Sequence, residues 1–140
     1  MNAVFLIARL LFALVFMTSA IGHITKANDM AGYAKFKGAP GGKFGVVFSG
    51  VTLGIGALML VLGIFGDLGA LLIFATLIPI TYFMHPYWKE TDAQAKMGDR
   101  VMFNKNVGLM GAALGFFLLF AATQAAGLGW TITGPLFHLS

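Results

Sequence analysis

The sequence predicts an all-α fold: an integral membrane four-helix transmembrane bundle with a short amphipathic interfacial segment in the first loop. Hydrophobic residues make up 59% of the 140 residues and charged residues only 10%, which is too little polar surface to cover a water-soluble globule of this size. The few charges are gathered into short stretches and leave four long apolar runs between them. A helix needs about 20 apolar residues to cross a bilayer. We therefore predict a single transmembrane domain over residues 1–140.

The four apolar runs predict transmembrane helices at about 2–22, 44–65, 68–85 and 107–128. Each should be helical, because lipid offers no hydrogen bonds to an open backbone and the alternation typical of barrel strands is absent. The first run has a second interpretation, a signal peptide cut near Ala20. No basic residue precedes its apolar core and Arg9 interrupts it, so we favour a retained anchor.

The first loop is predicted to contain a short helix lying on the bilayer surface. Within residues 28–37, Met30, Tyr33 and Phe36 are interleaved with Lys35 and Lys37, a pattern typical of interfacial amphipathic helices. The Gly-rich stretch at residues 38–42 should end this helix before the second span.

Basic residues predict the orientation of the bundle. Nearly all of them fall in loops 23–43 and 86–106, and short loops rich in Lys and Arg stay in the cytoplasm. Both termini and the Gly66-Asp67 turn should then lie on the opposite side, most simply of a bacterial inner membrane. Anionic lipid headgroups account for the positive charge, so the expected partners are the lipid bilayer and other membrane subunits, and no nucleic acid.

The composition excludes several kinds of chemistry. The chain has no cysteine, which rules out disulfide exchange, iron–sulfur clusters and covalent c-type haem. No phosphate-binding glycine motif is present. The acidic residues are all predicted in loops or turns, which argues against a transporter built around an intramembrane carboxylate; they are Asp29, Asp67, Glu90, Asp92 and Asp99. We expect no catalytic residue and no covalently bound cofactor.

Arg9 lies about two turns inside the first predicted helix. A charge at that depth needs a partner or a route to water. Asp67 is predicted at the same membrane face, so one hypothesis is a structural Arg9–Asp67 ion pair. The alternative is that Arg9 extends along the helix to reach the headgroups.

The opposite membrane face collects polar and aromatic residues at the predicted helix ends. Imidazoles can hydrogen-bond a quinone, an ammonium can stabilise an anion, and aromatic rings can stack on a flat headgroup. The predicted small-molecule site comprises His23, Tyr82, His85, Tyr87, Trp88, Asn104, Lys105 and Asn106. The alternative is an interfacial belt of aromatic residues and lysines without a ligand. Two histidines are too few ligands for a metal, and His138 is predicted at the other face.

Small residues four apart predict close helix packing, since they let helix backbones approach one another in lipid. The two pairs are Gly50 with Gly54 and Gly111 with Gly115. The spacing leaves open whether each pair packs within the bundle or against another subunit.

Several short motifs follow one another in a recognisable order, namely Ile7-Ala8-Arg9-Leu10-Leu11, Gly22, Gly32-Tyr33, Lys37-Gly38-Ala39-Pro40, Leu62-Gly63-Ile64-Phe65, Phe83-Met84-His85-Pro86-Tyr87-Trp88 and Met102-Phe103-Asn104-Lys105-Asn106. Over residues 4–120 this order resembles the DoxX family. The resemblance implies a four-helix inner-membrane protein that serves as the membrane subunit of an oxidoreductase, in thiosulfate-to-quinone electron transfer or beside enzymes of oxidative-stress defence.

Three positions depart from the pattern of that family. His23 stands where the family usually has Lys, Leu53 where it has Glu, and Asp67 where it has Arg. Two functional hypotheses follow. The chain is a small subunit of a quinone-linked redox complex, offering a docking surface or a quinone-headgroup pocket, or it is a structural accessory subunit that packs at the edge of a large membrane complex and organises lipid or pigment.

Overall fold

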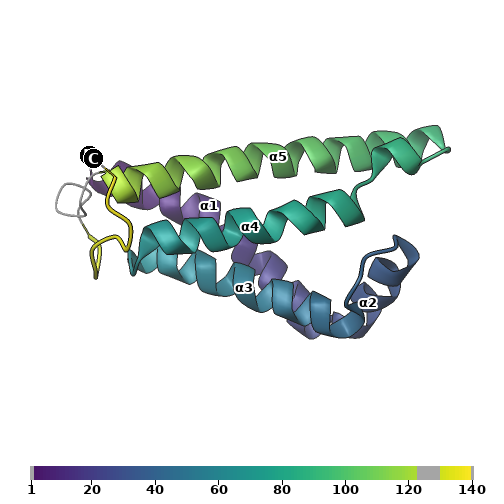
Figure 1. Cartoon of the computed structure of the whole chain (residues 1–140), viewed down its shortest axis with the longest axis horizontal. Coiled ribbons are helices and arrows are strands. Elements are labelled where there is room, and N and C mark those ends of the chain that lie inside the picture. Colours follow the sequence, from purple (N-terminus) through teal and green to yellow (C-terminus); the bar gives the residue numbers. More distant parts are fainter. Residues whose placement is uncertain (1, 123–129, 140) are drawn as a thin grey trace.

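The computed structural model describes residues 2–122 and 130–139, and the regular elements found in them are all helical (Figure 1). Four of the helices are long and apolar enough to span a membrane, which confirms the predicted fold class. The elements are α1 (Asn2–Thr25), α2 (Ala27–Phe36), α3 (Gly42–Leu62), α4 (Gly66–Met84), the 3₁₀ turn η1 (Tyr87–Lys89) and α5 (Ala93–Ala122).

The last span differs from its prediction. It was expected at 107–128, but α5 begins at Ala93 and has 30 residues. A helix of this length is about 45 Å long, well beyond the ~30 Å hydrocarbon core, so its first turns can carry charge. The absence of charge is therefore a poor guide to the first residue of this helix, and the predicted start at 107 is too late. Asp99 lies on α5 and not in a loop. The predicted end, from 123 onward, lies outside the described residues.

The amphipathic helix expected in the first loop is confirmed as α2. Its Ala27 and Ala34 are buried, whereas Tyr33 and Phe36 are exposed. The chain then turns into α3 through Gly38 and Gly41, whose φ angles of 78° and 90° lie in the left-handed region. Residues with a side chain rarely adopt that region, so these glycines end α2 and set the direction of α3.

The spanning helices pack in the order α1, α3, α4, α5. Gly50 and Gly54 of α3 lie against His23 and Ala20 of α1, so this predicted packing pair is used inside the bundle. Gly111 and Gly115 are different. A Cβ added at either would meet no described atom within 4 Å, so this pair packs against nothing in the described part of the chain.

The two halves of the bundle separate at one end. Figure 1 shows α1 and α3 diverging from α4 and α5 towards the end that carries α2. At the other end the helices converge around a core that includes Phe12, Leu60, Ile73 and Phe120. Residues 130–139 cover that converged end, where Ile132 and Thr133 donate backbone hydrogen bonds to Leu62 and Gly63 at 3.2 and 3.0 Å.

Arg9 and Asp67 lie at the converged end, and each is 0% exposed. The predicted ion pair between them is not formed among the described residues, and the Arg9 side chain is enclosed by protein atoms. Instead the C-terminal segment supplies one hydrogen-bond partner to each, while Arg9 Nε, Arg9 Nη1 and Asp67 Oδ1 have none among the described residues. Arg9 Nη2 donates to the carbonyl oxygen of Trp130 at 3.0 Å, and the Phe137 N–H donates to Asp67 Oδ2 at 2.6 Å. These contacts could not be predicted from the sequence, because backbone groups of a distant segment carry no sequence signature.

Replacing Asp67 with alanine is expected to lower the free energy of unfolding by about 1–3 kcal/mol, because the N–H of Phe137 loses its acceptor at a fully buried carboxylate. Asp67→Asn should cost less, since its amide oxygen can still accept this hydrogen bond. Thermal unfolding in mild detergent measures the difference. Asp29→Ala is the control, because Asp29 is exposed on α2. Equal stability of Asp67→Ala and the unmodified protein would contradict the anchoring role of Asp67.

Candidate functional site

A cavity of about 1210 Å³ lies where the two halves of the bundle separate, and all five α-helices contribute to its lining. Ligand pockets are commonly about 300–1,000 Å³, so the cavity can hold a headgroup together with part of an apolar tail. Its lining on α4 runs from Leu72 to Met84, about 18 Å along the helix axis, and His85 follows directly. Most of this length is apolar. The imidazoles and charged residues of the lining lie at the end near α2, whereas Thr18, Thr52 and Thr76 add hydroxyls farther along α1, α3 and α4.

His23 is one of the polar residues in the lining. It lies in the last turn of α1, where Gly50 leaves room for it against α3. Its Nδ1 is 3.0 Å from the carbonyl oxygen of Val46 and 3.0 Å from Ser49 Oγ. Ser49 in turn donates to the Val46 oxygen at 2.9 Å. The imidazole is thus fixed through Nδ1, whereas Nε2 has no hydrogen-bond partner among the described residues.

His85, which follows α4, also lines the cavity and is held in the same way. Its Nδ1 is 3.3 Å from Oδ1 of Asp99 on α5. Asp99 Oδ2 accepts a hydrogen bond from Lys37 Nζ at 2.7 Å, and Lys37 also donates to Glu90 Oε1 at 2.6 Å. We call Lys37, His85, Glu90 and Asp99 the ionic cluster. It joins the end of α2 to η1 and α5, and so closes α2 over the cavity.

Lys37 is the central charge of this cluster, and its side chain is only 9% exposed. Burial by itself lowers the pKa of Lys37, but the hydrogen bonds to Asp99 and Glu90 outweigh burial and raise the pKa above its usual range. Because the pKa of Lys37 is higher in the folded than in the unfolded chain, the charged Lys37 stabilises the fold fully at any pH below the ordinary lysine pKa. This stabilisation is lost only as the pH rises through the pKa that Lys37 has in the folded chain. The cluster is therefore intact at neutral pH.

The ionic cluster was missed by sequence reasoning, which placed Lys37 in the amphipathic segment and Asp99 in a loop and paired neither of them. A signal was available. The same count of membrane crossings that brings His23 and His85 to one face also brings loops 23–43 and 86–106 together, and these loops hold charges of both signs.

Asn106 and Lys105 of α5 are two further polar residues of the lining. Asn106 is only 6% exposed, and its side-chain amide has no hydrogen-bond partner in the part of the chain that the structure describes. Buried amides are normally hydrogen-bonded, so this amide is available to a ligand. Lys105 is exposed at the edge of the cavity.

The structure brings His23, His85, Lys105 and Asn106 to one cavity, but the other predicted site residues do not line it. Tyr82, Tyr87 and Trp88 pack on one another and on Phe103, with ring centroids 5.2–5.8 Å apart. Tyr82 is two residues from the lining residue Ile80, about 200° around the helix. Asn104 is exposed outside the cavity. These aromatic side chains brace the chain reversal between α4 and α5.

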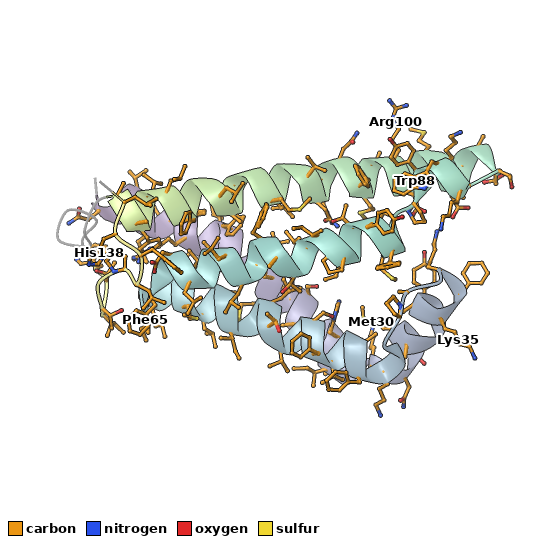
Figure 2. All side chains as sticks on the ribbon, viewed as in Figure 1. Met30, Lys35, Phe65, Trp88, Arg100 and His138 are labelled. Atoms are coloured by element: carbon orange, nitrogen blue, oxygen red, sulfur yellow. The ribbon has the colours of Figure 1, made fainter. Side chains whose placement is uncertain are left out.

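Figure 2 shows Trp88 and Arg100 at the end of the molecule near α2, and Phe65 and His138 at the opposite end. His138 is therefore far from the cavity lining, in agreement with its predicted place. Within residues 2–122 and 130–139, no three His, Asp or Glu side chains are grouped so as to hold a metal ion.

A comparison with protein families finds a match over residues 4–86 to the family model described as DoxX. These residues run from the first turn of α1 to Pro86, just beyond the end of α4. Neither the curated proteins nor the solved structures gave a match.

Proposed function

The chain belongs to the DoxX family, and from this premise we propose that it is a small membrane subunit of a redox complex whose cavity binds the headgroup of a lipid-soluble quinone. Four apolar helices place the chain in a lipid bilayer, where quinones are dissolved. A quinone combines a flat polar headgroup with a long apolar tail. The cavity has the matching arrangement, with a polar end near α2 and an apolar remainder.

The observation that supports this proposal most strongly is the unpaired amide of Asn106, which is nearly buried in the cavity lining. The fully buried side-chain atoms without a partner among the described residues belong to Arg9 and Asp67. The amide of Asn106 is therefore still accessible, and a ligand in the cavity can form a hydrogen bond with it. His23 and His85 add two further nitrogen atoms at the same end. Three polar groups from three separate parts of the chain can fix the orientation of one headgroup.

Replacing Asn106 with leucine is expected to weaken quinone binding by about tenfold or more, since one buried hydrogen bond is worth about 1–3 kcal/mol. The measurement is calorimetric titration of a short-chain benzoquinone into the purified chain in lipid nanodiscs. Asn104→Leu is a matched control two residues away, outside the cavity lining. If the two variants bind equally well, or if the unmodified chain binds no quinone, the proposed site is wrong.

A second function, that of a structural accessory subunit, is favoured by one observation. The face of α5 that carries Gly108, Gly111 and Gly115 has open space around all three. Glycine faces of this kind let another transmembrane helix approach closely. In this alternative the chain contributes packing to a larger membrane complex, and the cavity holds lipid.

A further inference from the structure

Both histidines in the cavity lining are held through the same ring nitrogen by oxygen atoms that only accept hydrogen bonds. His23 Nδ1 lies 3.0 Å from the carbonyl oxygen of Val46, and His85 Nδ1 lies 3.3 Å from the carboxylate of Asp99. A nitrogen lone pair facing either oxygen would be repelled. The proton of each neutral ring is therefore on Nδ1.

The hydroxyl of Ser49 does not change this assignment for His23. It already donates its proton to the Val46 oxygen at 2.9 Å, so towards the ring it offers an oxygen lone pair. Val46 and Ser49 thus both require a donor at Nδ1 of His23.

The second nitrogen of each ring follows from the first. A neutral imidazole with its proton on Nδ1 presents a lone pair at Nε2. In the described ranges, Nε2 of His23 and Nε2 of His85 have no hydrogen-bond partner, and both side chains line the cavity. Pro79 leaves one backbone carbonyl of α4 without its usual helical donor. It has no N–H to donate to the carbonyl oxygen of Ala75 one turn earlier, and both residues are part of the lining.

We infer that the cavity selects the reduced form of a quinone, the hydroxyl-bearing quinol, over the oxidised dicarbonyl form. This inference rests on the proposed quinone site and names which redox form it takes. The hydroxyl groups of a quinol donate to Nε2 of His23 and of His85. The carbonyl oxygens of a quinone carry only lone pairs and would face acceptors at both positions.

The donors in the lining do not reverse this preference. The amide of Asn106 can turn to present either its oxygen or its N–H₂, so it serves both forms of the headgroup. Lys26 and Lys105 donate only, but both are exposed and keep water as a partner whichever form is bound. The hydroxyls of Thr18, Thr52 and Thr76 already donate to carbonyl oxygens of their own helices. The two histidines are the groups that distinguish hydroxyl from carbonyl. A site built to accept from a hydroxyl group rejects analogues that lack it, commonly by tenfold or far more.

The test compares a decyl-substituted benzoquinone with its quinol, titrated anaerobically into the full chain in nanodiscs of phosphatidylcholine and phosphatidylglycerol. We expect the quinol to bind at least tenfold more tightly. Equal affinities, or tighter binding of the quinone, would overturn the inference but leave the quinone site standing. Binding of neither form would overturn the proposed function itself.

Asp99→Asn provides the sharper test, because an amide can turn its N–H towards Nδ1 of His85 and so favour the ring tautomer with its proton on Nε2. The quinol-to-quinone affinity ratio should then fall about tenfold. Glu90→Gln is the matched control, since Glu90 shares Lys37 with Asp99 but has no contact with His85. An unchanged ratio in Asp99→Asn, or an equal fall in Glu90→Gln, would refute the tautomer argument.

A measurement on the unmodified protein keeps the inference testable if Asp99→Asn does not fold. Nitrogen-15 NMR of labelled histidine distinguishes protonated from unprotonated ring nitrogens. The neutral rings of His23 and His85 should both carry the proton on Nδ1, and a proton on Nε2 of both rings would exclude the proposed selectivity.

Discussion

Replacing Lys37 with methionine is expected to lower the free energy of unfolding by about 3 kcal/mol, because the variant leaves the carboxylates of Glu90 and Asp99 close together, poorly hydrated and without their cation. Lys37 is 9% exposed and lies 2.6 and 2.7 Å from these two carboxylates. The helix α2 should separate from α5 in this variant. Since α2 contributes Met30, Tyr33 and Ala34 to the cavity lining, ligand affinity should fall as well.

Chemical unfolding in mixed micelles measures the stability of Lys37→Met. The control is Lys35→Met, because Lys35 is exposed and Figure 2 shows it on the outer side of α2, whereas Met30 lies on the side towards the bundle. Adding Glu90→Gln and Asp99→Asn to Lys37→Met should recover most of the lost stability, since no buried charge then remains unpaired. A loss in Lys35→Met as large as that in Lys37→Met would rule out a specific role of the ionic cluster.

Gly50→Leu is expected to have a comparably large effect, through packing. A Cβ at Gly50 would collide with the side chain of His23, and overpacking of a tight contact costs typically about 1–3 kcal/mol. The collision forces α1 and α3 apart and moves His23 away from Val46 and Ser49. We therefore expect lower thermal stability together with a loss of quinol binding of about tenfold or more.

Gly111→Leu is the matched control for Gly50→Leu, because the space around Gly111 is open. It should leave both the stability and the ligand affinity of the isolated chain unchanged. Its effect in the native membrane tests the accessory function. If this face packs against another subunit, Gly111→Leu should release the chain from the complex with which it co-purifies. A destabilised Gly111→Leu would show instead that the face is covered within the chain.

The predicted fold depended on features that a linear sequence carries well. Uncharged runs of about 20 residues locate spans directly, because burial of charge in lipid is costly at every position. The same rule misplaced the start of α5. Lys96, Asp99 and Arg100 lie in its first turns, and a helix that extends beyond the hydrocarbon core is free to carry them.

The candidate site was predicted in part. The number of membrane crossings between them predicts that His23, His85, Lys105 and Asn106 lie at one membrane face. The structure places all four in the lining of one cavity. Membrane depth alone does not say which way a side chain points, however. Tyr82, Tyr87 and Trp88 share that depth but pack on one another.

The sequence by itself determined the membrane location, the number of spans, the interfacial α2 helix and the face that holds the histidines, because these follow from hydrophobicity and charge along the chain. Only the tertiary structure decided which partners the buried ionisable groups have. Lys37 and Asp99 are 62 residues apart, and Arg9 and Trp130 are 121 residues apart. Such contacts depend on the separation of α1 and α3 from α4 and α5 and on the return of residues 130–139 over the converged end. Hydrogen bonds are directional and act over about 3 Å, so they are specified by this packing and not by the order of residues.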